Sequence, residues 1–319
     1  MAALLGKGLD DHRRTLLKFA LAAAAAPAAG LLPGVASATA ARLTVAPLAG
    51  RLSLISGAAA NIVVAHAGDE LLLVDGGSAA DAKALQKLLA ENFPGARLRA
   101  VVNTHWHWAQ SGFNATARKA GVDVVAHENT RLWLSTEVNS RWEDKIYQPQ
   151  PPEALPNKTF YYGPQTLDFG GGKVEYAHLG QAHTDGDIYV RFPEENLIVA
   201  GDVVSPGRYP IIDSASNGWL GGIHSALKTL VNRCDAATKV IAGTGAPVGV
   251  DALKQQQEMC YTVISRIGEN YYKGGTYEEI VAANPTREFD AQFGDPALFL
   301  KQAYETAWYH VGEIRRVAR

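Results

Sequence analysis

The stretch Ala100-Val101-Val102-Asn103-Thr104-His105-Trp106-His107 joins a short apolar run to two histidines spaced two residues apart. The apolar run predicts a buried strand that ends near Asn103. In an extended segment, side chains two residues apart point to the same side, so both imidazoles can face one metal ion while Trp106 and Trp108 pack the other way. Neutral imidazole is a good zinc ligand. Taken alone, the pair is explained equally well by packing among its aromatic neighbours.

Two more motifs with metal-ligating side chains stand at strand ends. The stretch Ala182-His183-Thr184-Asp185-Gly186-Asp187 precedes a predicted strand, and Ala200-Gly201-Asp202 ends the next one. Loops at strand ends are where a sheet scaffold presents binding and catalytic groups. The chain therefore holds a His-x-His pair, an isolated histidine about 75 residues later and an isolated aspartate about 20 residues after that.

Further outward, strand-like and helix-like patterns alternate. Short strands are predicted within 51–75, then a helix at 79–92, the strand at 100–102, a helix at 112–120, a strand at 122–125 and a helix from about 128. Residues 140–164 are rich in proline and predict a long functional or connecting loop. A second β-rich half spans about 158–204, followed by a helix at 219–232, a strand at 239–241 and helices at 251–270 and 297–314. Two β-then-α halves predict an α/β fold with two sheets face to face and helices outside.

The order and spacing of the three motifs resemble the metallo-β-lactamase superfamily over most of residues 50–250. The strand end Leu-Val-Asp-Gly-Gly at 73–77 is a further matching element. The resemblance implies a four-layer αββα sandwich, here with additional C-terminal helices. It also implies that His105, His107 and His183 bind the first zinc ion, and that Asp202 is a bridging or second-site carboxylate.

The second metal position of that family is depleted in this chain. The family motif is His-x-His-x-Asp-His, but Ala109 stands at the aspartate and Gln110 at the last histidine. The late Gly-His-Gly turn reads Gly243-Thr244-Gly245, with Thr244 in place of histidine. Alanine cannot bind a metal, and neutral glutamine and threonine are poor zinc ligands. We therefore expect at most one tightly bound zinc ion, or none.

The remaining side chains are sufficient for a mononuclear site. Three histidines leave a fourth coordination position open, which is the arrangement of a catalytic zinc. Asp202 is the candidate for orienting or deprotonating a water molecule there. Gln110 is the candidate for donating a hydrogen bond to a developing oxyanion. Asp202 and Gln110 are thus the predicted catalytic residues.

Two classes of function fit these residues. The first is a metal-dependent hydrolase with a mononuclear or otherwise altered zinc site, acting on an ester, thioester, lactone or lactam. The second is a metal-poor, non-hydrolytic member of the fold that binds a small molecule or a partner. The four retained side chains favour the first, and the replacements at 109, 110 and 244 favour the second.

The first forty residues differ in composition from the rest. Arg13-Arg14 precedes an apolar run from Phe19 to Leu32 that is interrupted by Pro27 and Gly30. The run is too short and too broken for a membrane helix, which needs about 20 apolar residues. Small-x-small cleavage sites follow at 36–40. Residues 1–40 resemble a twin-arginine export signal, which predicts a periplasmic or secreted protein. The remaining residues, 41–319, are then expected to form one metallo-β-lactamase-like domain.

The net charge and the cysteine content limit which classes of partner and which disulfides we expect. The 30 basic and 32 acidic residues give a formal charge of −2, so no strong basic field exists to hold nucleic acid. We expect a small-molecule substrate, no nucleic acid and no stable membrane insertion, and the sequence makes no prediction of an oligomeric state. Cys234 and Cys260 either pair in an oxidising compartment or remain two separate thiols.

Several other polar and aromatic residues near the motifs have structural or functional interpretations. Asp75 is expected to support the site or its turn, and Asp185 and Asp187 to cap turns. Trp106, Trp108 and Trp219 either line the cleft or pack in the core. The residues proposed as substrate contacts, on the long loop after Asp202, are Tyr209-Pro210 and Asn217-Gly218-Trp219.

Overall fold

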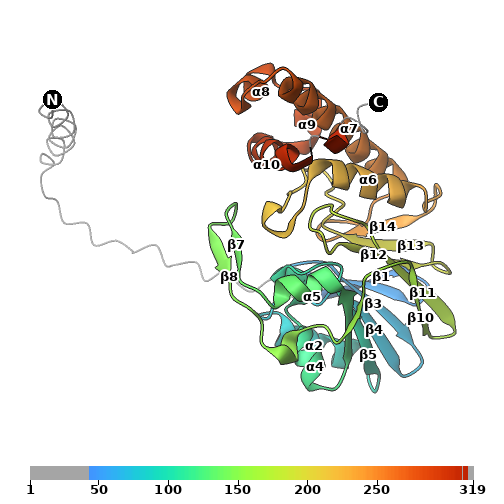
Figure 1. Ribbon diagram of the computed structural model, residues 1–319. Coiled ribbons are helices and arrows are strands. Elements are labelled where there is room, and N and C mark those ends of the chain that lie inside the picture. The colour runs from blue at the N-terminus through green and yellow to red at the C-terminus, as the bar shows by residue number, and fades with distance from the viewer. Residues whose placement is uncertain (1–42, 311, 315–319) are drawn as a thin grey trace, which may run out of the picture. The chain divides into compact units, whose positions relative to one another are not determined.

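Two β-sheets pack face to face, and helices cover the outer face of each (Figure 1). The computed structural model describes residues 43–310 and 312–314. The export signal predicted at 1–40 lies outside these residues. No helix in the described part of the chain is long and apolar enough to span a bilayer.

The first sheet has seven strands in the order β1-β2-β3-β4-β5-β6-β9. Their bounds are β1 (Thr44–Ala49), β2 (Leu52–Ser56), β3 (Ile62–Ala67), β4 (Glu70–Val74), β5 (Arg97–Val102), β6 (Asp123–His127) and β9 (Lys158–Phe160). The pairs from β1 to β4 are antiparallel, whereas β4, β5, β6 and β9 run parallel. The carboxyl ends of β4, β5 and β6 therefore meet at one edge of the sheet.

The second sheet has five strands in the order β10-β11-β12-β13-β14. Their bounds are β10 (Gln165–Phe169), β11 (Gly172–His178), β12 (Ile188–Phe192), β13 (Leu197–Gly201) and β14 (Lys239–Ala242). Strand β12 is antiparallel to β13, and β13 is parallel to β14. The start of β12 and the end of β13 therefore lie at the same edge, which brings the segments around His183 and Asp202 together.

Three hydrophobic core clusters separate the four layers, which are the two sheets and the helices outside each of them. Ala100 and Val102 of β5 face the second sheet, whereas Val101 faces the helices α2 (Ala82–Asn92) and α4 (Asn114–Lys119). The second sheet packs in turn against α6 (Leu220–Val231), α7 (Val250–Tyr272) and α10 (Ala297–Ala307). This arrangement confirms the predicted αββα sandwich with additional C-terminal helices.

The remaining helices are short. They are α3 (Trp108–Ser111), α5 (Glu128–Leu134), α8 (Tyr277–Ala283), α9 (Asp290–Phe293), η1 (Pro152–Ala154), η2 (Ser214–Ser216) and η3 (Trp308–His310). Neither α8 nor α9 was expected from the sequence, and the helix predicted at 297–314 passes into the 3₁₀ turn η3 after Ala307. Cys234 and Cys260 are both free thiols.

The prediction of a continuous loop at 140–164 was wrong in part. This stretch contributes to the hairpin of β7 (Val138–Ser140) and β8 (Lys145–Tyr147), and it also holds η1 and the edge strand β9. Strand β9 pairs only with β6, and the hairpin strands pair only with each other. Such short strands carry almost no periodic signal, because tertiary packing of side chains such as Tyr147 holds them in place.

A stacked pair of imidazoles, His127 and His178, is expected to make the protein less stable at mildly acidic pH. Their ring centroids are 3.8 Å apart, and the His127 Nδ1 atom accepts the backbone N–H of Asn129 as the N-cap of α5. Burial, and then the neighbouring His178, lowers the pKa of His127 from 6.5 to about 4. Burial lowers the pKa of His178 as well.

Because the pKa of His127 is depressed, the unfolded chain binds more protons than the native state between these two values. Stability is therefore present above pH 6.5 and is lost as the pH falls toward about 4, with a loss of at most about 2 kcal/mol by pH 5. Urea unfolding at pH 7 and pH 5 measures this loss. His127→Asn keeps an N-cap acceptor without a titrating group, so it should flatten the pH dependence, whereas His66→Asn should not. An unchanged slope in His127→Asn would contradict this account.

Candidate metal centre

The four ligands expected from the sequence come together at one edge of the sandwich. His105 and His107 follow β5, His183 precedes β12 and Asp202 follows β13. One ligand atom from each of these side chains lies within 4.8 Å of the ligand atoms of the other three. His105, His107 and His183 are buried, and the side chain of Asp202 is 22% exposed. The cluster is therefore shielded by protein but open to solvent beside Asp202.

The inner nitrogens of the three imidazoles point at one another. The His107 Nδ1 atom is 3.0 Å from the Nε2 atom of His105 and 3.0 Å from the Nε2 atom of His183. The Asp202 Oδ2 atom lies 3.5 Å from His105 Nε2 and 4.0 Å from His183 Nε2. Three nitrogens and one carboxylate oxygen thus surround a single point.

The outer nitrogen of each ring has a fixed hydrogen-bond partner. His183 Nδ1 donates to the backbone carbonyl of Ile211 at 2.9 Å, since a carbonyl oxygen can only accept. His107 Nε2 faces the Asp213 carboxylate at 3.2 Å, and His105 Nδ1 faces the hydroxyl of Thr104 at 3.1 Å. With the ring protons on these outer nitrogens, the inner nitrogens present lone pairs to one point.

Buried hydrogen bonds hold the first histidine in place. Thr104 donates to Asp75 through both its backbone N–H and its hydroxyl, each at 2.8 Å. Asp75 ends β4 with a left-handed backbone, at φ 62°, which turns its carboxylate toward β5. Asp75 thus supports the site, as expected. Burial lowers the pKa of His105 to about 4, so its imidazole is neutral at pH 7, the state that binds a metal.

Asp213 is a functional residue that sequence reasoning missed. It is fully buried in the loop after β13, where it also accepts from the Ala215 N–H and the Ser216 hydroxyl. The Ser216 hydroxyl in turn accepts from Trp106 Nε1 at 2.9 Å. Only the turn-forming run Asp-Ser-Ala-Ser at 213–216 marks this position in the sequence, and that run says nothing about the distant His107.

Asp213→Asn is expected to weaken zinc binding by about 10- to 100-fold, because a neutral amide orients and polarises His107 less well than a carboxylate. Hydrogen bonds from His107 and Ser216 oppose the effect of burial and hold the pKa of Asp213 at about 2, so the carboxylate is ionised at neutral pH. Competition with a chromophoric chelator measures the affinity. Asp168→Asn, on the exposed strand β10, is the control, and equal affinities in the two variants would contradict the assigned role.

Two residues expected at the second metal position, Gln110 and Asp202, are hydrogen-bonded to each other. Gln110 Nε2 donates to Asp202 Oδ2 at 3.0 Å. A Cβ atom added at Gly243 would lie 1.9 Å from Asp202 Oδ1, so only glycine allows this approach of the late turn. Gln110 therefore positions Asp202 in this structure. Within the described part of the chain, Asp202 Oδ1 and Gln110 Oε1 are buried acceptors without a hydrogen-bond partner.

The donor set fits one divalent cation of the zinc class. Three neutral imidazoles with fixed outer protons converge on one point, and a carboxylate stands beside them. The Asp202 side chain is 22% exposed and its Oδ2 atom accepts from the Gln110 amide, both of which favour the ionised carboxylate. A cation would complement that charge and the converging lone pairs. At the second position, Gln110 and Asp202 supply only oxygen atoms.

Several other predicted residues have structural roles. Trp106 and Tyr209 are buried, and the Tyr209 hydroxyl donates to Asp290 at 2.7 Å, within the helical layer. Trp219 stacks on His310 at 4.1 Å. Asp187 accepts from the backbone and the hydroxyl of Thr184, as expected of a turn cap. The remaining residues of this group that make defined contacts are Asp185, which accepts from Trp133 and Asn217, and Trp108, which packs on Tyr147.

A buried His₃–Asp cluster at the edge of an αββα sandwich defines a metal site of the metallo-β-lactamase type. The family model described as the metallo-beta-lactamase superfamily matches residues 56–243, which include all four side chains. The chain belongs to this superfamily.

Solved structures of low sequence identity share the fold. A metallo-beta-lactamase from Pontibacter korlensis is 19% identical, with a TM-score of 0.56, over 68% of this chain and 98% of that chain. The DIM-1 metallo-beta-lactamase is 18% identical with a TM-score of 0.56, over 69% of this chain and 98% of that chain. The inverting sec-alkylsulfatase Pisa1 from Pseudomonas sp. is 16% identical with a TM-score of 0.64, over 82% of this chain but 50% of that chain.

Proposed function

We propose that the protein is an exported hydrolase with a single zinc ion. The observation that carries the proposal is the set of fixed outer nitrogens on His105, His107 and His183, which leaves three lone pairs directed at one point. A histidine cluster kept only for packing has no need of three fixed tautomers. The Asp202 carboxylate beside them supplies a proton acceptor for hydrolysis.

His105, His107 and His183 would hold the zinc ion. When bound, zinc polarises a substrate oxygen and makes water more acidic. Asp202 Oδ2 lies 3.5 Å from His105 Nε2, so it is the oxygen positioned to take a proton from the attacking water. Gln110 Nε2 donates to this same oxygen, and Gln110 remains our candidate for donating to a developing oxyanion when the substrate displaces that contact.

We propose an ester, thioester, lactone or lactam as the scissile bond of a small-molecule substrate. The similar structures include metallo-beta-lactamases and a sec-alkylsulfatase, which illustrates that the fold serves several hydrolytic reactions. The competing proposal is a metal-poor member that binds a small molecule or a partner without hydrolysis. The loss of ligands at 109, 110 and 244 supports it.

Metal content and activity, measured on one preparation, separate these two proposals. Protein is purified without added zinc, its metal content is quantified, and hydrolysis of a β-lactam, a lactone, a thioester and an ester is assayed with and without zinc. We expect about one zinc ion per chain and zinc-dependent turnover of at least one substrate. Zinc-replete protein without bound metal and without turnover would favour the non-hydrolytic proposal.

Export is expected to remove the first forty residues. The twin arginine and the small-residue cleavage sites at 36–40 support this proposal. Edman or mass-spectrometric analysis of protein from the native host should place the mature N-terminus near Thr39 or Ala41. The Arg13→Lys, Arg14→Lys double variant should remain in the cytoplasm. Periplasmic protein that retains Met1, or a wild-type protein found only in the cytoplasm, would refute export by this route.

A further inference from the structure

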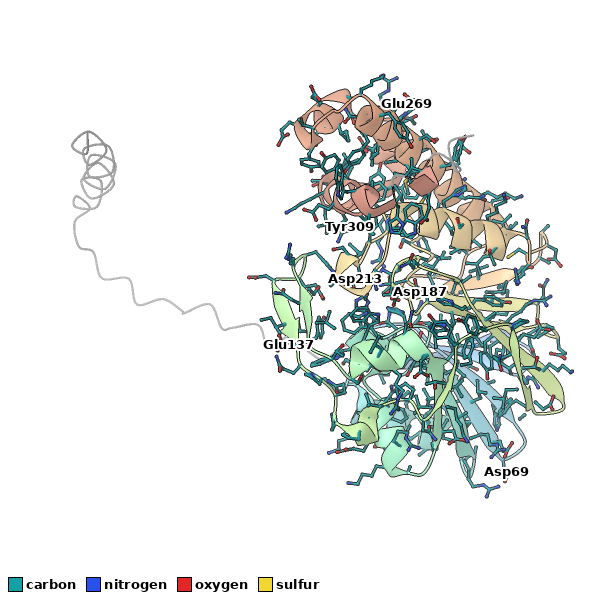
Figure 2. The ribbon with its side chains drawn as sticks, viewed as in Figure 1. Asp69, Glu137, Asp187, Asp213, Glu269 and Tyr309 are labelled. Atoms are coloured by element: carbon teal, nitrogen blue, oxygen red, sulfur yellow. The ribbon has the colours of Figure 1, made fainter. Side chains whose placement is uncertain are left out.

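A large groove lies beside the metal centre, between the β7–β8 hairpin and the C-terminal helices. Its volume is about 1290 Å³, against roughly 300–1,000 Å³ for typical small-molecule pockets. In Figure 2, Asp213 lies between Tyr309 of the helical layer and Glu137 at the start of the hairpin. Both Tyr309 and Glu137 line the groove. None of the four metal-ligating side chains lines it, so the groove is a separate site.

The groove touches the loop that holds two of the zinc ligands. Ser214 and Ala215 form part of its lining, directly after Asp213, whose carboxylate faces His107. Gln302 of α10, which also lines the groove, accepts the backbone N–H of Ile212 in the same loop at 3.1 Å. A molecule in the groove would therefore contact the support of the metal centre without touching the metal.

Two hydrogen-bond donors in the lining lack partners among the described residues. They are Gln302 Nε2 and Trp142 Nε1, both buried atoms. Gln302 is only 4% exposed, so leaving its amide unpaired in a protein interior is costly. Both residues line the groove, so acceptor oxygens of a ligand bound there are the partners that these two donors lack.

The lining combines flat aromatic faces with polar groups of both kinds. Trp133, Trp142, Tyr304, Trp308 and Tyr309 supply the aromatic rings. Two acidic side chains, Glu137 and Glu305, are balanced by Arg141 and Lys301, so the charges do not select an anion or a cation. A typical small-molecule pocket has only a few polar groups, whereas charged and amide side chains make up a large part of this lining. An acyl chain would leave most of these polar groups unpaired.

A neutral carbohydrate matches this lining better than any purely apolar molecule. Hydroxyl groups both donate and accept, so they can pair with the carboxylates as well as with the unpartnered N–H groups. The C–H faces of a pyranose ring carry a weak positive charge, which complements the negative face of an aromatic ring. A β-1,4-linked chain with equatorial substituents presents such faces on both sides. An acetamido carbonyl adds a strong acceptor for Gln302 and Trp142.

We propose that this groove is a binding site for a neutral β-1,4-linked oligosaccharide, separate from the metal centre. The proposal goes beyond the hydrolase function and does not depend on zinc or on turnover. It depends on the aromatic walls, the balanced charges and the two unpartnered donors.

Titration of full-length mature protein with chitotetraose tests this site, both zinc-free and zinc-loaded. Three of the six tryptophans, Trp133, Trp142 and Trp308, line the groove, so binding should change tryptophan fluorescence saturably in both forms. Calorimetry gives the dissociation constant. Tyr309→Ala, at a residue that is 84% exposed and therefore not needed for folding, should weaken binding tenfold or more.

Matched variants make the result specific. Tyr162→Ala removes an 82% exposed tyrosine outside the groove and should leave the dissociation constant unchanged. Gln302→Glu keeps an oxygen to accept the Ile212 N–H but removes the unpartnered donor, so it should also weaken binding by tenfold or more. The proposal is overturned if chitotetraose produces no saturable signal, if Tyr309→Ala and Tyr162→Ala behave alike, or if sodium decanoate binds in the groove while chitotetraose does not.

Discussion

Replacing His107 with alanine is expected to abolish tight zinc binding. The substitution removes the nitrogen that lies 3.0 Å from both other inner nitrogens, and it leaves the buried Asp213 carboxylate without its imidazole partner. Two histidines and a carboxylate then remain, with an uncompensated buried charge next to them. Inductively coupled plasma mass spectrometry after dialysis against a weak chelator should show about one zinc ion per wild-type chain and almost none in His107→Ala.

Gln110→Ala is the matched control, because Gln110 contacts Asp202 but none of the inner nitrogens. It should keep zinc bound and change only the activity. Restoring the family pattern with Ala109→Asp, Gln110→His and Thr244→His should raise the stoichiometry toward two, since each change returns a ligand to the second position. Two tightly held zinc ions in the unmodified protein would refute this description of the site.

Asp202→Asn is expected to reduce turnover by about 10²- to 10⁴-fold, the usual contribution of a positioned acid or base. Asparagine retains an oxygen to accept from Gln110 Nε2, so the geometry beside the histidines should persist while the proton acceptor is lost. The three imidazoles should keep zinc bound, and the loss should therefore appear in kcat rather than in metal content.

The assay is best run on the substrate that the hydrolase panel identifies. Asp168→Asn serves as control, because its carboxylate is exposed on β10 and does not belong to the metal cluster. Turnover in Asp202→Asn within twofold of the wild-type value, with zinc bound, would exclude Asp202 as the proton acceptor. Loss of zinc together with turnover would instead assign Asp202 a role in holding the metal.

Most of the sandwich was predictable because its strands and long helices carry periodic signals. The buried strand β5 reads directly from Ala100-Val101-Val102, and α6 and α7 match the predicted ranges to within two residues at each end. The hairpin β7–β8 and the edge strand β9 were not predictable. Each is too short for a pattern to develop, and a neighbouring strand or aromatic side chain far away in sequence holds it in place.

The metal ligands could be named before any coordinates because the order and spacing of the three strand-end motifs resemble the metallo-β-lactamase superfamily. That resemblance implied His105, His107, His183 and Asp202. Tertiary structure decided everything that orients them. Asp213 meets His107 only because the loop after β13 folds back over the site, and Gln110 reaches Asp202 only because α3 and the late turn at Gly243 converge there. The groove beside the site is lined by the β7–β8 hairpin and by α10, which are about 150 residues apart in the chain. Only tertiary packing brings these two elements together. Contacts between distant segments leave no periodic trace in the sequence, whereas the ligands belong to short motifs whose order and spacing are visible in it.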